Sequence, residues 1–122
     1  MQPALETGTY QPASATSFGS VPMAERFGAV RTSLERGRQV VWLEGEIDLA
    51  LAAVLAGLVV HARDLGFVVV LDCSRLTFCD CTLANFISAL SDQVVVELRQ
   101  APSPLVDLLM ICGLTDRAQQ VQ

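Results

Sequence analysis

The stretch FVVVLDCSRLTFCDCTLANFISAL, residues 67–90, decides the fold class of this chain. It begins with Phe67–Leu71, a β-rich run that is apolar on both faces, as is typical of a central parallel strand. Asp72–Thr77 is expected to be a loop or the exit of that strand. Four apolar residues then take the i, i+3, i+4, i+7 spacing of one helix face: Leu83, Phe86, Ile87 and Leu90. A strand followed by a helix is a unit of an α/β fold.

The residues before this unit predict a hairpin and a second helix. Val30–Glu35 alternates loosely and predicts a first strand, Gly37 lies in the turn, and Arg38–Ile47 predicts the second strand. Asp48 is a candidate N-cap for an apolar helix from Leu49 to about Arg63. Because this helix is apolar all round, we expect it either to be core or to offer a surface to a partner.

The residues after the unit predict one more strand and one more helix. Val94–Leu98 is the expected strand, and Ser103 is the expected N-cap of a helix with Pro104 at its first position. Gly113 is the expected helix stop. One face of this helix is apolar: Leu105, Leu108, Leu109 and Cys112. The order β-β-α-β-α-β-α predicts an α/β fold, with a mixed sheet of about four strands packed against about three helices.

Composition limits the domain organisation and the partners. The chain has 122 residues, of which 52% are hydrophobic, and this predicts a single domain with a packed core. Residues 1–22 are rich in Pro, Ser, Thr and Gly and predict a disordered arm, which leaves 23–122 as the domain. The net charge is −5 and the eight basic residues are scattered arginines, a pattern that argues against direct nucleic-acid binding.

The sequence also indicates a compartment and excludes several kinds of site. Met1–Thr9 has no secretory pattern, and the longest apolar run, Leu49–Val60, is shorter than the roughly 20 residues of a membrane span. We therefore expect a cytoplasmic protein with no membrane partner and with reduced cysteines. The spacing Cys79-Asp80-Cys81 does not suit a metal, and His61 is the only histidine. The sequence contains no acid/base pair and no phosphate-binding loop, so we expect neither an enzyme nor a cofactor.

The candidate site is the junction Phe78–Thr82, between the central strand and the following helix. Sites in open α/β sheets lie at the carboxyl ends of strands. If Asp80 caps the helix, Cys81 and Thr82 lie in its first turn, where the backbone N–H groups favour a phosphate or a thiolate. Asp48 follows a neighbouring strand, so we expect it at the same edge of the sheet.

Three pieces of the chain resemble one known family. GEIDLA (45–50), VVVLDCSRLTFCDCTL (68–83) and APSPLVDLLMICGL (101–114) are similar to the STAS domain of bacterial anti-sigma factor antagonists and sulfate transporter tails, over about residues 27–117. The resemblance implies a protein that binds an anti-sigma factor, often a serine/threonine kinase. It would thereby regulate sigma-factor-dependent transcription, under the control of a phosphorylation switch.

The resemblance also implies site residues, with one departure. The family pattern at the start of the second helix is Asp, Ser, Ser or Thr, Gly, and here it reads Asp80, Cys81, Thr82, Leu83. Cys81 holds the usual phospho-acceptor position, so Thr82 is the nearest candidate acceptor. The expected partner-binding residues are Asp48, Asp80, Cys81, Thr82 and Leu83.

A second hypothesis is a thiol-based redox sensor on the same scaffold, in which Cys81 acts with Cys79 or Cys73, or a scaffold without phosphorylation control. A position in a first helical turn lowers a thiol pKa, whereas flanking carboxylates raise it. Structural interpretations stay open for the same residues: Asp48 and Asp80 as plain caps, Cys81 as a small helix-start residue, and His61 as a solvated residue. Under these interpretations the remaining cysteines are core: Cys73, Cys79 and Cys112.

Overall fold

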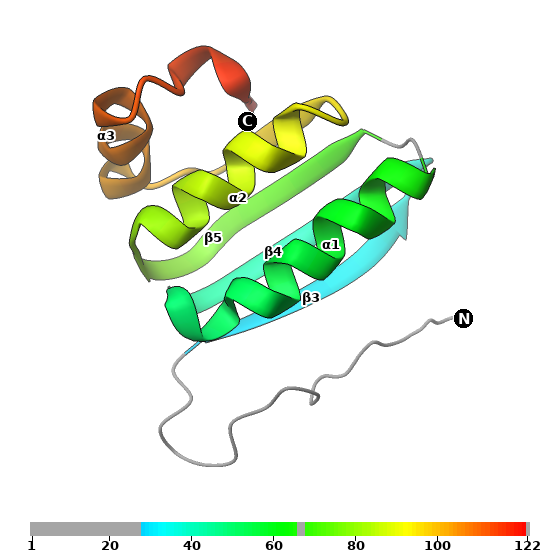
Figure 1. Cartoon of the computed structure of the whole chain (residues 1–122), viewed down its shortest axis with the longest axis horizontal. Coiled ribbons are helices and arrows are strands. Elements are labelled where there is room, and N and C mark those ends of the chain that lie inside the picture. The colour runs from blue at the N-terminus through cyan, green and yellow to red at the C-terminus, as the bar shows by residue number, and fades with distance from the viewer. Residues whose placement is uncertain (1–27, 66–67, 122) are drawn as a thin grey trace.

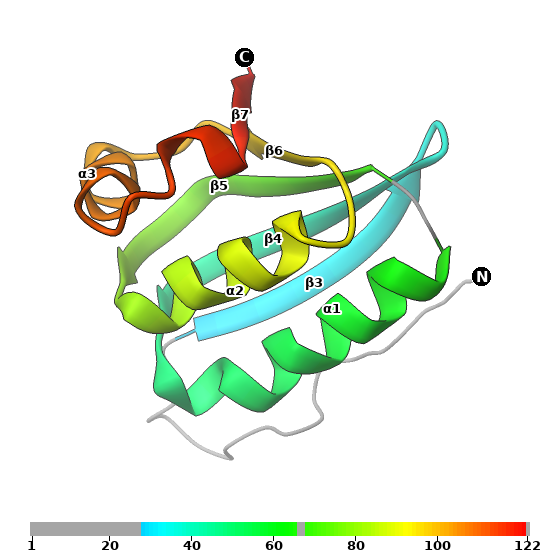
Figure 2. The same cartoon turned by 45° about the horizontal axis from the view of Figure 1, so that its top comes forward.

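A mixed five-stranded sheet with two long helices on one face forms the domain (Figures 1 and 2). The computed structural model describes residues 28–65 and 68–121, so the arm expected at 1–22 lies outside the described residues. The strands are β3 (Gly28–Glu35), β4 (Arg38–Ile47), β5 (Val69–Cys79), β6 (Val96–Arg99) and β7 (Gln119–Val121). The helices are η1 (Leu49–Leu51), α1 (Ala52–Leu65), α2 (Cys81–Ser91), α3 (Ser103–Ile111) and η2 (Thr115–Arg117).

The predicted hairpin is confirmed, and it forms one side of the sheet. β3 pairs antiparallel with β4 along the whole length of β3, from Gly28 opposite Gly45 to Glu35 opposite Arg38. The two turn residues, Arg36 and Gly37, both take left-handed backbone conformations, with φ of 54° and 80°. Such a two-residue turn matches the right-handed twist of the flanking strands.

β5 is the central strand, as predicted, and runs parallel to both β4 and β6. The prediction of a loop or strand exit at Asp72–Thr77 was wrong, because β5 continues through these residues to Cys79. Its register with β4 shifts twice, between Trp42 and Glu44 and between Gly45 and Glu46. Asp72 supports the first irregularity, since its Oδ1 accepts hydrogen bonds from the backbone N–H and the hydroxyl of Ser74, at 3.0 and 2.6 Å. This polar segment is therefore a bulged strand and not a loop.

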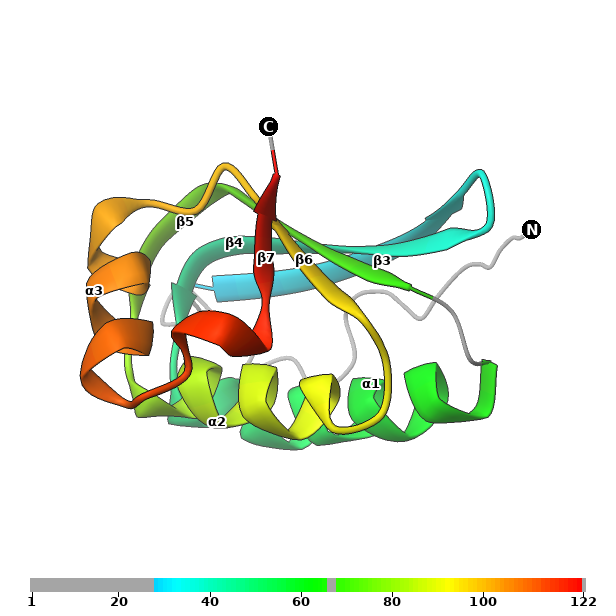
Figure 3. The ribbon, with the colours of Figure 1, turned by 90° about the horizontal axis from the view of Figure 1, so that it is seen from above.

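The core lies between the sheet and α1 and α2, which run side by side beneath it (Figure 3). Alternate residues of the central strands face the helices, among them Leu43 on β4, Leu71 on β5 and Leu98 on β6. The predicted apolar face of α2 is buried in full: Leu83, Phe86, Ile87 and Leu90. The apolar α1 buries only one face, through Leu55, Leu58 and Ala62. No helix of the described ranges 28–65 and 68–121 is long and apolar enough to cross a membrane.

The C-terminal elements differ from the prediction at three places. Pro102 caps α3 and Ser103 is its first residue, so the predicted Ser103 cap was wrong. The expectation that Cys112 is core was also wrong, because α3 ends at Ile111 and Cys112 is exposed beyond the buried face. Gly113 has φ of 72° and ends the helix as predicted. β7 was missed, because three residues with two glutamines carry no strand pattern.

The opposite face of the sheet carries a polar network in place of helices. The Arg99 guanidinium bonds the Asp72 carboxylate at 2.8 Å and lies 5.2 Å from the centroid of the Trp42 ring. Arg31 stacks over the same ring at 5.6 Å, and the indole N–H donates to the Ser33 hydroxyl at 3.2 Å. Four strands are thus tied together by side chains from this face.

Replacing Asp72 tests whether this network holds the bulged strand. Hydrogen bonds from Ser74 and Arg99, together with the charge of Arg99, outweigh the effect of burial and lower the pKa of Asp72 below its ordinary value of 3.8. The folded state therefore gains stability from the carboxylate above that pH and loses it as the pH falls through the lower folded pKa. We expect Asp72→Asn to reduce the free energy of unfolding at pH 7 by about 1–3 kcal/mol.

The measurement is urea denaturation of both proteins at a series of pH values. The difference between them should shrink steadily once the pH falls below 3.8. A difference that is the same at neutral and acidic pH would show that the Asp72 charge does not contribute.

Candidate functional site

The ends of β4 and β5 meet at one edge of the sheet. Ile47 and Cys79, the last residues of the two strands, are partners in the parallel register, so Asp48 and Asp80 follow side by side. This confirms the prediction that the two aspartates share an edge. It also brings together the start of η1, which leads into α1, and the start of α2.

Both aspartates are helix caps with the same geometry. Each has an extended backbone, and each Oδ1 accepts a hydrogen bond from the N–H two residues on: Ala50 at 3.1 Å and Thr82 at 2.8 Å. A cap of this kind contributes roughly 1 kcal/mol. The carboxylate charges also lie at the positive ends of two neighbouring helices, where they are favoured. The capping role expected of Asp48 and Asp80 is confirmed.

The candidate acceptor residues occupy the first turn of α2. Cys81, the first residue, is exposed, and Thr82, the second, is half-buried. The backbone N–H of Thr82 donates a hydrogen bond to Asp80 Oδ1. A phosphate on the Thr82 hydroxyl would add negative charge beside the carboxylates of Asp48 and Asp80, so modification would change the local charge sharply.

An apolar groove between α1 and α2 adjoins the two caps. It has a volume of about 260 Å³ and includes Thr82 in its wall. The other lining residues are Leu49, Ala52, Leu55, Ala56, Val59, Asn85, Phe86 and Ala89. Two large apolar side chains near the caps are exposed to solvent, Leu49 at 75% and Phe78 at 52%. Exposed apolar surface beside polar groups is typical of protein–protein contact sites.

This groove was not predicted from the sequence. The available signal was the placing of small residues, Ala52, Ala56 and Ala89, on two helices that flank the same edge. Small side chains there leave room between the helices. Pairing those faces requires knowledge of how α1 lies against α2.

Leu83 is the one predicted partner-binding residue that the structure does not place at the surface. Its side chain is completely buried against the sheet. A partner cannot touch it directly, so we correct that assignment to core. Asp48, Asp80, Cys81 and Thr82 all lie at the edge.

The cysteines divide into two groups by environment. Burial raises the pKa of Cys73 to about 12, with further effects from Asp72 and Cys79. Burial, and then the Asp80 charge, also raise the pKa of Cys79. Cys81 is exposed, and all four thiols are free. Thiols with raised pKa values react poorly, which weighs against Cys73 or Cys79 as the redox partner of Cys81.

Metal binding has no support in the described part of the chain. Residues 28–65 and 68–121 contain no group of three or more His, Cys, Asp or Glu side chains that could hold a metal ion. His61 is exposed on α1, as expected for a solvated residue.

Comparisons with solved structures place this fold among known ones. An anti-sigma factor antagonist from Mycobacterium paratuberculosis matches with a TM-score of 0.69 at 17% identity, over 80% of this chain and 87% of that one. The unphosphorylated anti-sigma factor antagonist SpoIIAA matches with a TM-score of 0.58 at 15% identity, over 77% and 89% of the two chains. The phosphorylated Bacillus cell fate determinant SpoIIAA gives 0.57 at 16% identity, over 77% and 92%.

These similarities identify the fold. The chain has the STAS-like α/β fold of anti-sigma factor antagonists, which confirms the fold that the motifs at 45–50, 68–83 and 101–114 predicted. No protein-family model matches the sequence, and no curated protein matches it.

Thiol labelling tests the environments of the cysteines. We expect Cys81 and Cys112 to react rapidly with iodoacetamide in the native protein, because both are exposed. Cys73 should stay unmodified and Cys79 should react slowly, because burial raises their pKa values. Peptide mass spectrometry after timed quenching measures the four rates, and unfolding in urea supplies the control in which all four react. Fast labelling of Cys73 in the native state would contradict the structure, and a Cys79–Cys81 disulfide after mild peroxide would revive the redox hypothesis.

Proposed function

We propose that this protein is an anti-sigma factor antagonist, a cytoplasmic, non-catalytic protein that binds an anti-sigma factor of the serine/threonine kinase type. By occupying that factor it would regulate transcription without touching DNA. The partner class comes from proteins of the same fold, which are described as anti-sigma factor antagonists.

One observation carries the proposal: two helix caps, an exposed thiol and a threonine meet beside exposed apolar side chains at one edge of the sheet. Asp48 and Asp80 are held there by strand register and by their capping bonds. Leu49 and Phe78 add apolar surface that nothing in the described chain covers. Polar groups held rigidly next to an apolar patch are suited to recognition of a protein surface.

We further propose that control acts through Thr82. One of the proteins with this fold is described in a phosphorylated form. Here the thiol of Cys81 is not an ordinary kinase substrate, and Thr82 is the adjacent hydroxyl. Because Thr82 lines the groove between α1 and α2, a phosphate on it would place charge at the mouth of an apolar surface. Such a charge is costly to bury and so would oppose partner binding.

Substitutions at this edge test the docking surface. We expect Thr82→Glu and Leu49→Ser each to weaken binding to the anti-sigma factor by about tenfold or more. Thr82→Glu would place a charge in the contact, and Leu49→Ser would remove an apolar contact. Isothermal titration calorimetry with the purified anti-sigma factor measures the change.

Three matched variants serve as controls. Thr82→Val keeps the side-chain shape without charge, and Val95→Ser removes another exposed apolar side chain far from the edge, before β6. Both should bind as the wild type does. Asp80→Asn keeps a capping oxygen but removes the charge, and so separates helix capping from recognition. Equal affinity for every variant would refute this docking surface.

A kinase assay tests control through Thr82. After incubation with the anti-sigma factor and ATP, we expect the intact mass to increase by one phosphate in the wild type and to stay unchanged in Thr82→Val. Cys81→Ser should accept phosphate more readily than the wild type, because a hydroxyl then occupies the exposed first position of α2. In the wild type, phosphate found on a residue other than Thr82, or no phosphate at all, would contradict the assignment.

A further inference from the structure

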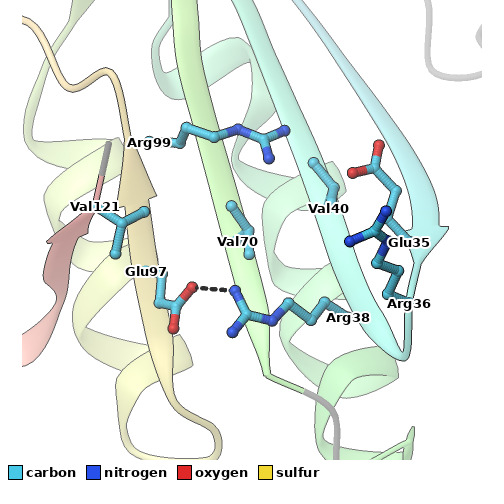
Figure 4. Close-up of a pocket in the computed structure, with 8 residues that line it drawn as sticks. All are labelled: Glu35, Arg36, Arg38, Val40, Val70, Glu97, Arg99 and Val121. Atoms are coloured by element: carbon cyan, nitrogen blue, oxygen red, sulfur yellow. Dashed lines mark hydrogen bonds and ion pairs between the residues drawn. The ribbon is translucent and has the colours of Figure 1, made fainter.

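The face of the sheet that carries no helices is hollowed into a trough, shown in Figure 4. The trough has a volume of about 890 Å³, within the range of small-molecule sites. Three arginines line it from separate parts of the fold: Arg36 from the hairpin turn, Arg38 from β4 and Arg99 from β6. The other lining residues are Glu35, Val40, Val70, Glu97 and Val121.

The floor of the trough is apolar and covered by charged side chains. Val40 and Val70 are only 1% and 2% exposed, although no helix packs on this face. The Arg38 guanidinium reaches across β5 and bonds the Glu97 carboxylate on β6 at 2.6 Å (Figure 4). The arginine side of this ion pair is exposed, so Arg38 can turn toward a ligand, at the cost of leaving the largely buried Glu97 carboxylate unpaired.

Arg36 occupies a position that costs backbone energy. Its φ of 54° lies in the left-handed region, which Gly and Asn adopt readily and other residues adopt only with strain. Within the described ranges, no carboxylate forms an ion pair with Arg36. Strained residues of this kind cluster at ligand sites, where a side chain in that place has a role.

We propose that this trough binds a small phosphate-bearing molecule through Arg36, Arg38 and Arg99. Guanidinium groups present a planar fork of donors that matches a phosphate oxygen pair, which a lysine ammonium does not. In the unliganded protein Glu97 occupies the donors of Arg38. The phosphate replaces the Glu97 carboxylate on Arg38. It is also bound by Arg36 and by the terminal nitrogens of Arg99, whose Nε stays bonded to Asp72.

The trough is separate from the docking edge, so this proposal does not depend on the proposed function. Asp48 and Asp80 lie at the carboxyl ends of β4 and β5 and start helices on the other face of the sheet. The trough lies over the opposite half of the sheet, near the hairpin turn and β7.

The single tryptophan of the chain gives a direct measurement. Arg99 lies 5.2 Å from the centroid of the Trp42 ring, so a ligand on Arg99 alters the surroundings of the indole. Inorganic pyrophosphate is the probe, titrated into the full chain, with sodium chloride at matched ionic strength as the control. We expect a saturable change in tryptophan fluorescence with pyrophosphate and none with chloride. The same response to both salts would overturn the proposal.

Two substitutions with opposite expected effects sharpen the test. Arg36→Gly removes one guanidinium and relieves the strained turn, so it should raise the half-saturating pyrophosphate concentration about tenfold while the protein stays folded. Glu97→Gln removes the competing carboxylate and should lower that concentration. Arg63→Gln, an exposed arginine on α1, should change nothing. Unchanged affinity in Arg36→Gly, or weaker binding in Glu97→Gln, would overturn the proposal.

Discussion

The parallel register of β4 and β5 is the constraint on which the candidate site depends. It places Ile47 beside Cys79, and the next residue of each strand is an aspartate that caps a helix. Two register shifts in this pairing let β5 use more residues than β4 over the same span. A slip of one residue would reverse which side chains face the core and would separate the two caps. Asp72 and Arg99, on the other face, hold the first irregularity in place.

The side chains on both faces of the sheet are positioned by that register. The helix face supplies the apolar packing of α1 and α2, and the same two helices supply the groove that includes Thr82. The helix-free face supplies the ion pairs and the stacked Trp42 that connect β3 to β6. The proposed docking edge and the proposed phosphate site therefore lie on separate parts of one sheet.

Much of this fold could be predicted from local patterns. Alternation, turn residues and helix spacing indicated the hairpin, the central strand and the face of α2, and Asp48 and Asp80 were identifiable as caps. One failure concerns an interaction between distant residues, and another concerns the end of a helix. The polar segment 72–77 is a strand because Asp72 bonds Ser74 and Arg99, a partner 27 residues away. Cys112 is exposed because α3 ends one residue earlier than its apolar spacing suggested.

The candidate site was also predictable in part from local sequence. Its residues follow strand ends, and parallel strands end at a common edge, so sequence order alone brought Asp48 to Asp80. Leu83 was assigned to the surface from its place in a motif, whereas its burial follows from the way α2 packs on the sheet. The groove, the trough and the exposed Leu49 depend on how whole elements lie against each other, which no single stretch of sequence contains.

Hydrogen–deuterium exchange of the protein, alone and with the proposed anti-sigma factor partner, tests the central claim most directly. The account predicts slower exchange on binding in two short segments, residues 48–52 and 80–86, which start the helices at the shared edge. Exchange in β3 and in the hairpin turn should stay the same. Protection confined to the helix-free face or to α3, with no change in those two segments, would contradict the account.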